Sequence, residues 1–533
     1  MVEIILYALI LCYPMLFWKT FSDAGFKSWQ AFIPVYNYII WLKIIQKRFY
    51  WFIWWLIPFL NIFMVILMTV ETAQCYNKHK IRQLAAAVFF PFIYFPYLEL
   101  SDKEHFTSPD KLKLPKKSSA RGWFDALIWA GMAAFIVRTF MIELYMIPTS
   151  SMEGSLMVGD YLFVSKMSYG AKAPETPLSI PFVHNTMPMT QSTNSYLEWI
   201  KLPYHRFPGY GKVKRFDDVV FNYPTGDTVI LERRAEDYYR VIRNLKYAFE
   251  NQEEIALRQD PEAQSYKRLF KKYGTDYHQG KEYQVANQEY HIISRPVDKE
   301  ENYVKRCVGI AGDTLLFDNH KLYINGKLTE DPKGLQYMYR IYTQGGPLTE
   351  RQLTPLSVSS ENMGYYYRSG LLALTKEKAE KIATYSNVMS VEVLQAPAGV
   401  AELDIFPFDT TLFKWNVDNF GPLYVPQAGA TIPLTKENMA LYRRIIEAYE
   451  KNIVKIEGDN VWINGEPATT YTFRMNYYWM MGDNRHNSLD SRYWGFVPEN
   501  HIVGKASFVL ISFDKDKSGF GKIRFSRLFK KAP

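Results

Sequence analysis

Residues 51–70 read WFIWWLIPFLNIFMVILMTV and contain no charged side chain. About 20 apolar residues in a helix cross the hydrocarbon core of a bilayer, so this stretch predicts a membrane span. The tryptophans at its start are typical of the aromatic belt at a membrane interface. The mean hydropathy of the whole chain is only −0.20. That average conceals the span, because the later part of the chain is polar.

Three further apolar stretches lie near the N-terminus, at residues 2–18, 84–98 and 123–142. The first is short, but it lacks the basic start and the small-residue cleavage site of a signal peptide. The second contains two prolines, which leaves spanning, re-entrant and interfacial placements open. The last carries its two charges towards its ends, where they reach the headgroups. We therefore predict that residues 1–142 form a multi-span membrane anchor.

The loop at residues 101–122 carries six basic and three acidic side chains. By the positive-inside rule this loop is cytoplasmic, and everything after the 123–142 span lies on the outer side. The alternative is that the basic run is a solvated linker. The whole chain has 533 residues and a net charge of +9. Next to membrane spans, this charge favours an anionic bilayer surface as partner, and we predict no nucleic-acid partner.

From residue 143 the composition changes to short β-branched and aromatic runs separated by Gly, Asp and Asn. Such runs predict strands at 161–165, 218–221, 314–317 and 507–511. The pairs Asn325-Gly326 and Asn464-Gly465 predict two tight hairpins. The expected fold is therefore a set of N-terminal transmembrane helices followed by a mainly β domain of antiparallel sheets.

Two longer blocks interrupt the β pattern, at residues 232–300 and 330–455. The first is polar and places four apolar residues on one helical face: Val241, Leu245, Ala248 and Phe249. The second contains two LTKE sequences, in which Thr375 and Thr435 are expected helix N-caps. We interpret the blocks as a helical and an α/β insertion into a β framework. The framework parts are residues 143–231, 301–329 and 456–533.

No metal or cofactor signature appears in the sequence. There is no CxxC or HExxH motif, and the nine histidines are scattered. The three cysteines are too isolated for a disulfide framework. We predict no metal and no cofactor.

Three polar runs are candidates for chemistry. The run IPTSSM at residues 147–152 directly follows the last predicted span, and NYVKRCVG at 302–309 places a lysine in an alternating strand. The run MGDNRHNSLDSR at 481–492 is dense in polar and turn-forming residues. Each has a simpler interpretation by itself: a hydroxyl-rich turn, an exposed strand lysine and a loop.

Together, in this order and after a membrane span, the runs resemble the motif boxes of bacterial type I signal peptidases. The boxes lie at residues 147–170, 216–224, 302–313 and 481–506. The resemblance implies a serine endopeptidase with a Ser–Lys dyad that removes signal peptides from exported preproteins. It also implies a multi-pass protein of the bacterial cytoplasmic membrane, with its catalytic domain on the periplasmic side.

The resemblance assigns roles residue by residue. Ser151 matches the nucleophile and Lys305 its general base. Thr149 matches the hydroxyl that joins the Ser151 N–H in the oxyanion hole, and Ser488 matches the hydroxyl that orients the lysine. Supporting charges are matched by Asp490, Arg492, Asp483 and Arg306. Positions lining shallow pockets for small residues at P1 and P3 are matched by Ile147, Met152, Leu156, Tyr303 and Val304.

Elementary chemistry is consistent with the dyad. A serine hydroxyl needs an adjacent base. A lysine with its usual pKa of about 10.4 is charged at neutral pH and becomes a base only when burial lowers that pKa. The sequence departs from the family pattern at Glu153-Gly154-Ser155, where Pro-Thr is frequent, and at Ser150, His486 and Cys307.

Two other interpretations compete. A catalytically inactive relative would act as a membrane-anchored binding or scaffold protein, but the matched Ser151 and Lys305 are both present. A repressor-type autoprotease shares the dyad, but it would need a DNA-binding domain in place of the apolar N-terminal region.

Overall fold

The computed structural model describes residues 13–56, 60–101, 103–112, 123, 130–131, 133–180, 182–190, 193–234, 236–251, 268 and 281–532. The chain forms two compact units. One comprises Met1–Ala134 with Thr176–Ser179 and Tyr196–Leu202, and the other comprises Phe135–Glu175, Ile180–Ser195 and Pro203–Pro533.

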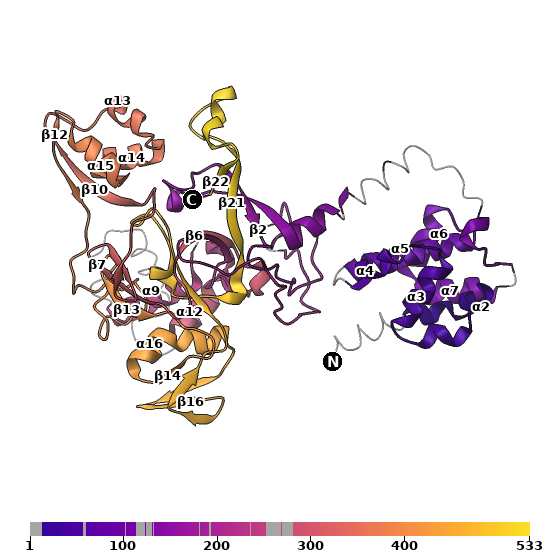
Figure 1. The fold of residues 1–533 in the computed structure, drawn as a ribbon. Helices are drawn as coiled ribbons and strands as arrows, with labels where there is room; N and C mark the ends of the chain where they lie inside the picture. The colour runs from indigo at the N-terminus through magenta and orange to yellow at the C-terminus, as the bar shows by residue number, and fades with distance from the viewer. Residues whose placement is uncertain are drawn as a thin grey trace. The chain divides into compact units, whose positions relative to one another are not determined.

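The first unit is helical (Figure 1). Its helices are α2 (Trp18–Asp23), α3 (Tyr36–Ile44), α4 (Tyr50–Leu56), α5 (Leu60–Cys75), α6 (Ile81–Phe89) and α7 (Pro91–Leu100). Aromatic rings form its core: the Phe17 ring lies 4.7 Å from Trp41 and 4.5 Å from Phe95. The Trp41 indole N–H is also satisfied, because it donates to Thr72 Oγ1 at 2.7 Å.

Among the described residues, no single helix is both long and apolar enough to cross a bilayer. The pair Arg82–Phe89 and Pro91–Leu100 reaches that length together, but its halves are bent by 114°. This pair contains the predicted 84–98 stretch. The predicted 51–70 span is divided between α4 and α5. Residues 2–12, 57–59, 124–129 and 132 of the predicted spans lie outside the described residues.

The second unit is built on a large sheet in which every pairing is antiparallel. The order is β1 (Ile142–Met146), β2 (Asp160–Ser165), β21 (Ile502–Ser512), β3 (Asp218–Asn222), β6 (Asn302–Gly309), β19 (Tyr477–Met481) and β20 (Val497–Pro498), with β22 (Lys530–Lys531) paired to β21. The predicted strands at 161–165, 218–221 and 507–511 are confirmed. Because β6 pairs with both β3 and β19, the box at residues 302–313 lies beside the start of the final box, residues 481–506.

A separate four-stranded sheet has the order β13 (Phe420–Tyr424), β7 (Thr314–Asp318), β8 (Lys321–Ile324) and β9 (Lys327–Leu328). The predicted hairpins are confirmed here and at β16 (Asn460–Ile463) and β17 (Glu466–Ala468). Asn325 and Gly326 have φ values of 52° and 76°, the left-handed conformation that such tight turns require. Strand β13 comes from the predicted second insertion, so inserted sequence completes a framework sheet.

In the predicted helical insertion, α9 (Tyr238–Glu250) begins at Asp237, whose side chain accepts from the Tyr239 and Arg240 N–H groups. The four apolar residues predicted to share a face are all buried. Helix α12 (Lys281–Glu289) packs against α9. Most of the sequence between these two helices lies outside the described residues.

The second insertion contains a small subdomain, hereafter the inserted subdomain (Figure 1). It consists of β10 (Gln336–Thr343), α13 (Glu350–Leu353), α14 (Ser360–Ser369), β11 (Leu371–Thr375), α15 (Lys376–Ala383) and β12 (Val388–Val393). Leu372, Leu374 and Ile382 are fully buried in its own core. Both predicted N-caps are confirmed: Thr375 caps α15 and Thr435 caps α16 (Lys436–Arg444).

Candidate active site

Ser151 and Lys305 meet in the structure although 154 residues separate them. Ser151 lies in a short 3-10 turn (Ser150–Met152) after edge strand β1, and Lys305 lies in the middle of β6. The Lys305 Nζ is hydrogen-bonded to the Ser151 Oγ at 2.5 Å. Lys305 is only 3% exposed. This geometry suits proton transfer between a hydroxyl and an amine.

Burial lowers the pKa of Lys305 from 10.5 to about 8. The charges of Asp490 and Asp483 act in the opposite direction but do not cancel this effect. Tyr303 and Cys307 lie beside Lys305 on the same face of β6, as strand alternation predicts. A pKa of about 8 leaves roughly a tenth of the lysine neutral, and so basic, at pH 7.

Thr149 lies beside the nucleophile. Its side chain is exposed, and its Oγ1 is 3.4 Å from the Ser151 Oγ. The position is compatible with a donor to an oxyanion formed at Ser151.

Ser488 lies beside the dyad, but in the described structure its buried Oγ has no hydrogen-bond partner. Gly482 separates it from the nucleophile: a Cβ at that position would lie 2.1 Å from the Ser488 Oγ and 2.5 Å from the Ser151 carbonyl oxygen. Gly482 is therefore required for space. It was not among the residues predicted from the sequence, although it lies in the polar run at residues 481–492 that was singled out there.

Two buried Arg–Asp pairs hold the final box. Arg492 donates to both Asp490 oxygens at 2.9 and 2.8 Å, and Arg306 donates to both Asp483 oxygens at 2.8 and 2.6 Å. Burial alone would raise the pKa of Asp490, but the charge and hydrogen bonds of Arg492 outweigh it and hold that pKa below its usual value. Asp490 also accepts from the Gly482 N–H at 3.1 Å, which ties the ion pair to the backbone beside Ser488.

Four of the five predicted pocket residues pack in one cluster, together with Leu162 and Val220. They are Ile147, Met152, Leu156 and Val304. Tyr303 packs elsewhere, on the face of β6 that it shares with Lys305. Its ring stacks on Tyr223 with centroids 4.6 Å apart. The structure therefore brings the first four together and places Tyr303 on the opposite face of the strand from Val304.

Two asparagines of the final box contact the nucleophile turn, and neither was predicted from the sequence. The Asn484 backbone N–H donates to the Ser151 carbonyl oxygen at 3.1 Å, and its side chain donates to the Ser150 carbonyl oxygen at 3.2 Å. The Asn487 side chain donates to the Ser150 Oγ at 3.0 Å. Their place in the GDNRHN sequence was the only available signal.

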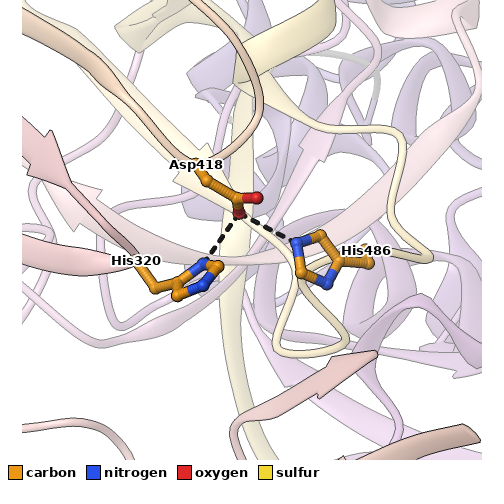
Figure 2. A group of neighbouring side chains, drawn as sticks. All are labelled: His320, Asp418 and His486. Atoms are coloured by element: carbon orange, nitrogen blue, oxygen red, sulfur yellow. Dashed lines mark hydrogen bonds and ion pairs between the residues drawn. The ribbon is translucent and has the colours of Figure 1, made fainter. Parts of the chain in front are cut away.

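His320, Asp418 and His486 form a second polar cluster (Figure 2). The Asp418 Oδ1 accepts from His320 Nδ1 at 2.9 Å and from His486 Nε2 at 2.8 Å. Two imidazoles and a carboxylate are a donor set that suits zinc. However, the Met338 N–H donates to His486 Nδ1 at 3.0 Å, so the proton of the neutral ring lies on Nε2 and faces Asp418. The contacts therefore favour a hydrogen-bonded junction over a metal site.

Comparison with known proteins identifies two families. Residues 120–364 and 467–511, together more than half of the chain, match the family described as signal peptidase, peptidase S26. These segments contain the dyad and both buried Arg–Asp pairs. Residues 29–109 match DUF5684, a family of unknown function.

Some relatives are similar to this chain over about three quarters of their length, at low identity. The chain is 24% identical to signal peptidase I of Buchnera aphidicola (subsp. Acyrthosiphon pisum) over 400 residues, which cover 74% of this chain and 77% of the relative. It is 22% identical to signal peptidase I of Haemophilus influenzae over 423 residues, which cover 79% and 78%. With the match of the family over more than half of its length, the chain belongs to the signal peptidase I (peptidase S26) family.

Proposed function

We propose that the protein is a membrane-bound serine endopeptidase that removes N-terminal signal peptides from exported preproteins. The observation that carries this proposal is the 2.5 Å contact between the Lys305 Nζ and the Ser151 Oγ, with Lys305 buried. An inactive scaffold protein would have no need for a lysine held at this distance from a serine. The membership in the signal peptidase family supports preproteins as the substrate class.

In the first step, neutral Lys305 accepts the Ser151 hydroxyl proton while the Ser151 Oγ attacks the scissile carbonyl carbon. The resulting oxyanion receives hydrogen bonds from the Thr149 hydroxyl and the Ser151 backbone N–H. Two such donors contribute several kcal/mol to the transition state.

In the second step, the charged Lys305 gives its proton to the leaving amine and the peptide bond breaks. The mature protein departs with its new N-terminus, and the signal peptide stays esterified to Ser151. Neutral Lys305 then takes a proton from water, which attacks the ester and releases a carboxylate. As the bond between the acyl carbon and the Ser151 Oγ breaks, charged Lys305 returns this proton to that oxygen and the released acid ionises in the solvent, so the enzyme is regenerated.

The substrate is proposed to bind as an added strand on β1. Strand β1 is the first in the order of the main sheet, and in the described structure it pairs only with β2. It leads directly to Thr149 and Ser151. The apolar cluster of Ile147, Met152, Leu156 and Val304 lies at the end of this strand and suits small P1 and P3 side chains.

The proposed location is the bacterial cytoplasmic membrane, with a multi-pass anchor in residues 1–142 and the catalytic unit on the periplasmic side. The bent apolar pair in α6 and α7 and the basic loop at 101–122 support this placement. The lipid bilayer is then a partner of the chain in addition to the preprotein.

The proposal is tested by incubating the full-length protein in detergent with a preprotein whose signal peptide ends in Ala-x-Ala. We expect one cut after the last alanine, identified by N-terminal sequencing of the product. The same preprotein with leucine at P1 is the control and should remain uncut. A preprotein that stays intact under all conditions, or equal cleavage of the leucine variant, would contradict the proposed specificity.

We expect Ser488→Ala to reduce kcat/KM strongly without abolishing cleavage. The proposed role of this hydroxyl is to orient Lys305: the Ser488 Oγ is buried beside Gly482, has no hydrogen-bond partner in the described structure, and takes no part in bond formation. A positioning hydrogen bond of this kind corresponds to roughly a 10- to 100-fold loss. Steady-state cleavage of the preprotein measures it. A variant as active as the parent protein would remove the orienting role from Ser488.

A further inference from the structure

The second insertion contacts two loops of the candidate site, one that carries Ser151 and one that carries the polar residues of the final box. We name residues 147–156 the serine loop and residues 482–492 the box loop. The short segment 333–338, which leads into β10, lies against both of them. Its contacts are made mainly by backbone atoms and buried polar side chains.

On the serine-loop side, the backbone at Gly154 approaches the backbone at Gly334 closely, with no side chain between them. A Cβ on Gly154 would lie 2.0 Å from the Gly334 carbonyl oxygen, and one on Gly334 would lie 2.7 Å from the Gly154 carbonyl oxygen. The Ser155 Oγ donates to the Lys333 carbonyl oxygen at 3.3 Å. The Gly154 position, which departs from the frequent family pattern, therefore fits the close approach of the inserted chain.

Glu153 completes this contact. Its carboxylate accepts from the Asn362 side chain of α14 at 2.9 Å, and the two residues are 6% and 8% exposed. Burial raises the pKa of Glu153 above its usual value. The acid that the sequence places beside the nucleophile is thus directed into the inserted subdomain. The Glu153 carboxylate is therefore not an exposed charge next to Ser151.

On the box-loop side, the segment pairs with the loop like a strand. The Gln336 N–H donates to the Asp483 carbonyl oxygen at 2.8 Å, and the Arg485 N–H donates to the Gln336 carbonyl oxygen at 2.9 Å. The Met338 N–H then reaches His486, whose Nε2 donates to Asp418 (Figure 2). The insertion therefore contacts the box loop at both its backbone and its histidine.

We propose that the second insertion is a brace for the Ser151–Lys305 pair, with Asn362 and Asp418 as positioning residues. Asn362 holds the serine loop through Glu153, and Asp418 holds the box loop through His486. The two loops already contact each other through Asn484, so a brace on both fixes the distance between them. The proposal rests on the proposed function for its kinetic consequences.

The contacts are too polar and too buried to be incidental. Glu153, Asn362, Gln336 and Asp418 are each below 9% exposed. Separating the insertion from the loops would remove the Asn362 donor from Glu153, the backbone partners of Gln336 and the His486 donor from Asp418, and each unsatisfied buried group costs about 1–3 kcal/mol. A small displacement of reacting groups, of about 1 Å, can lower a rate by about 100-fold. The brace is therefore expected to act on kcat.

The central test is a reversal of the Glu153–Asn362 hydrogen bond in the full-length protein. Asn362→Asp places two carboxylates in contact and should lower kcat about 10- to 100-fold, with KM changed less than about threefold. Combining it with Glu153→Gln restores a donor opposite an acceptor and should recover most of the lost kcat. Asn438→Ala is the matched control. Asn438 occupies the same position after the N-cap of α16, is half-buried and bonds locally to the Pro433 carbonyl oxygen.

Asp418→Ala tests the other contact, and Asp409→Ala is its control, because Asp409 bonds within its own turn to Thr411 and Leu412. We expect a similar loss of kcat for the first variant and a change below about twofold for the second. The Asp418→Ala variant also keeps the proposal testable if Asn362→Asp does not fold. Thermal unfolding, and protection of the β10 and β11 amides, show for each variant that the inserted subdomain is intact.

Hydrogen exchange provides a readout that does not require activity. The amides of Glu153, Leu156 and Asn484 are hydrogen-bonded within and between the two loops. They should exchange faster in Asn362→Asp and Asp418→Ala, and at the parent rate in both controls and in the reversed pair. Unchanged exchange, or a kcat within twofold of the controls, overturns the brace.

Two further measurements complete the test. If the parent protein cleaves no preprotein, the proposed function fails, and exchange alone decides whether the insertion holds the loops. If dialysis against EDTA lowers kcat and added Zn²⁺ restores it, His320, Asp418 and His486 form a metal site. The hydrogen-bonded role of Asp418 is then overturned.

Discussion

Ser151→Ala is expected to reduce preprotein cleavage by about 10⁶-fold, to below detection, while the protein stays folded. The Oγ of Ser151 is the atom in contact with the Lys305 Nζ, so removing it leaves no nucleophile for the carbonyl. Because the substitution deletes one oxygen at a half-exposed turn, stability should change little. Cleavage of an Ala-x-Ala preprotein measures the activity, and thermal unfolding measures the stability.

Ser150→Ala is the matched control, since the neighbouring hydroxyl could be mistaken for the nucleophile. The Ser150 Oγ is held by the Asn487 side chain, and removing that hydrogen bond should cost less than about 10-fold in kcat/KM. Mass spectrometry of the parent protein should find an acyl group on Ser151. An acyl group on Ser150, or full processing by Ser151→Ala, would eliminate Ser151 as nucleophile.

Lys305→Met is the second variant with a large expected effect. Methionine has nearly the shape of lysine without its amine, so it removes the general base and keeps the packing. The expected loss in kcat/KM is about 10²–10⁴-fold. For the parent, kcat/KM should rise with pH and level off above about 8, because the attacking form needs neutral Lys305. This rise should be absent from the residual activity of Lys305→Met.

The same variant should be more stable than the parent at neutral pH. In the parent the folded-state pKa of Lys305 is about 8, below the unfolded value of 10.5, so the unfolded state binds more protons between those pH values. The lowered pKa therefore reduces the free energy of unfolding. This reduction has its full size below pH 8 and shrinks as the pH rises towards 10.5. It amounts to about 3 kcal/mol, which Lys305→Met removes.

Denaturant unfolding at several pH values measures this difference. The gain of Lys305→Met over the parent should shrink as the pH rises from 8 to 10.5. A gain that does not depend on pH would contradict the lowered pKa. Lys505→Met is a suitable comparison, because that lysine is partly exposed and its Nζ pairs with Asp217. It should show no comparable gain at neutral pH.

Local sequence predicted most of the local structure. Strands β2, β3, β7 and β21 follow from β-branched and aromatic runs, because such residues suit a pleated, half-buried surface. The Asn-Gly hairpins follow from the left-handed backbone that those residues tolerate. The caps at Thr375 and Thr435 follow from the free N–H groups at a helix start. Each of these effects acts within a few residues.

Contacts between distant segments could not be predicted in this way. Nothing in the residues around Glu153 indicates that its partner is Asn362, 209 positions away. The pairing of β13 with β7 across inserted sequence was equally hidden. In each case the outcome depends on what packs against the segment.

Residue type and spacing were enough to predict the β character of the second unit, and the resemblance of the four boxes to those of signal peptidases pointed to Ser151 and Lys305. These are local properties, which any stretch of the chain carries before it folds. The 2.5 Å contact between the two side chains and the burial of Lys305 were set by the tertiary structure. So was the position of the second insertion against both active-site loops. Burial and distance arise when β6 is enclosed between β3 and β19, and no segment has them before the chain folds.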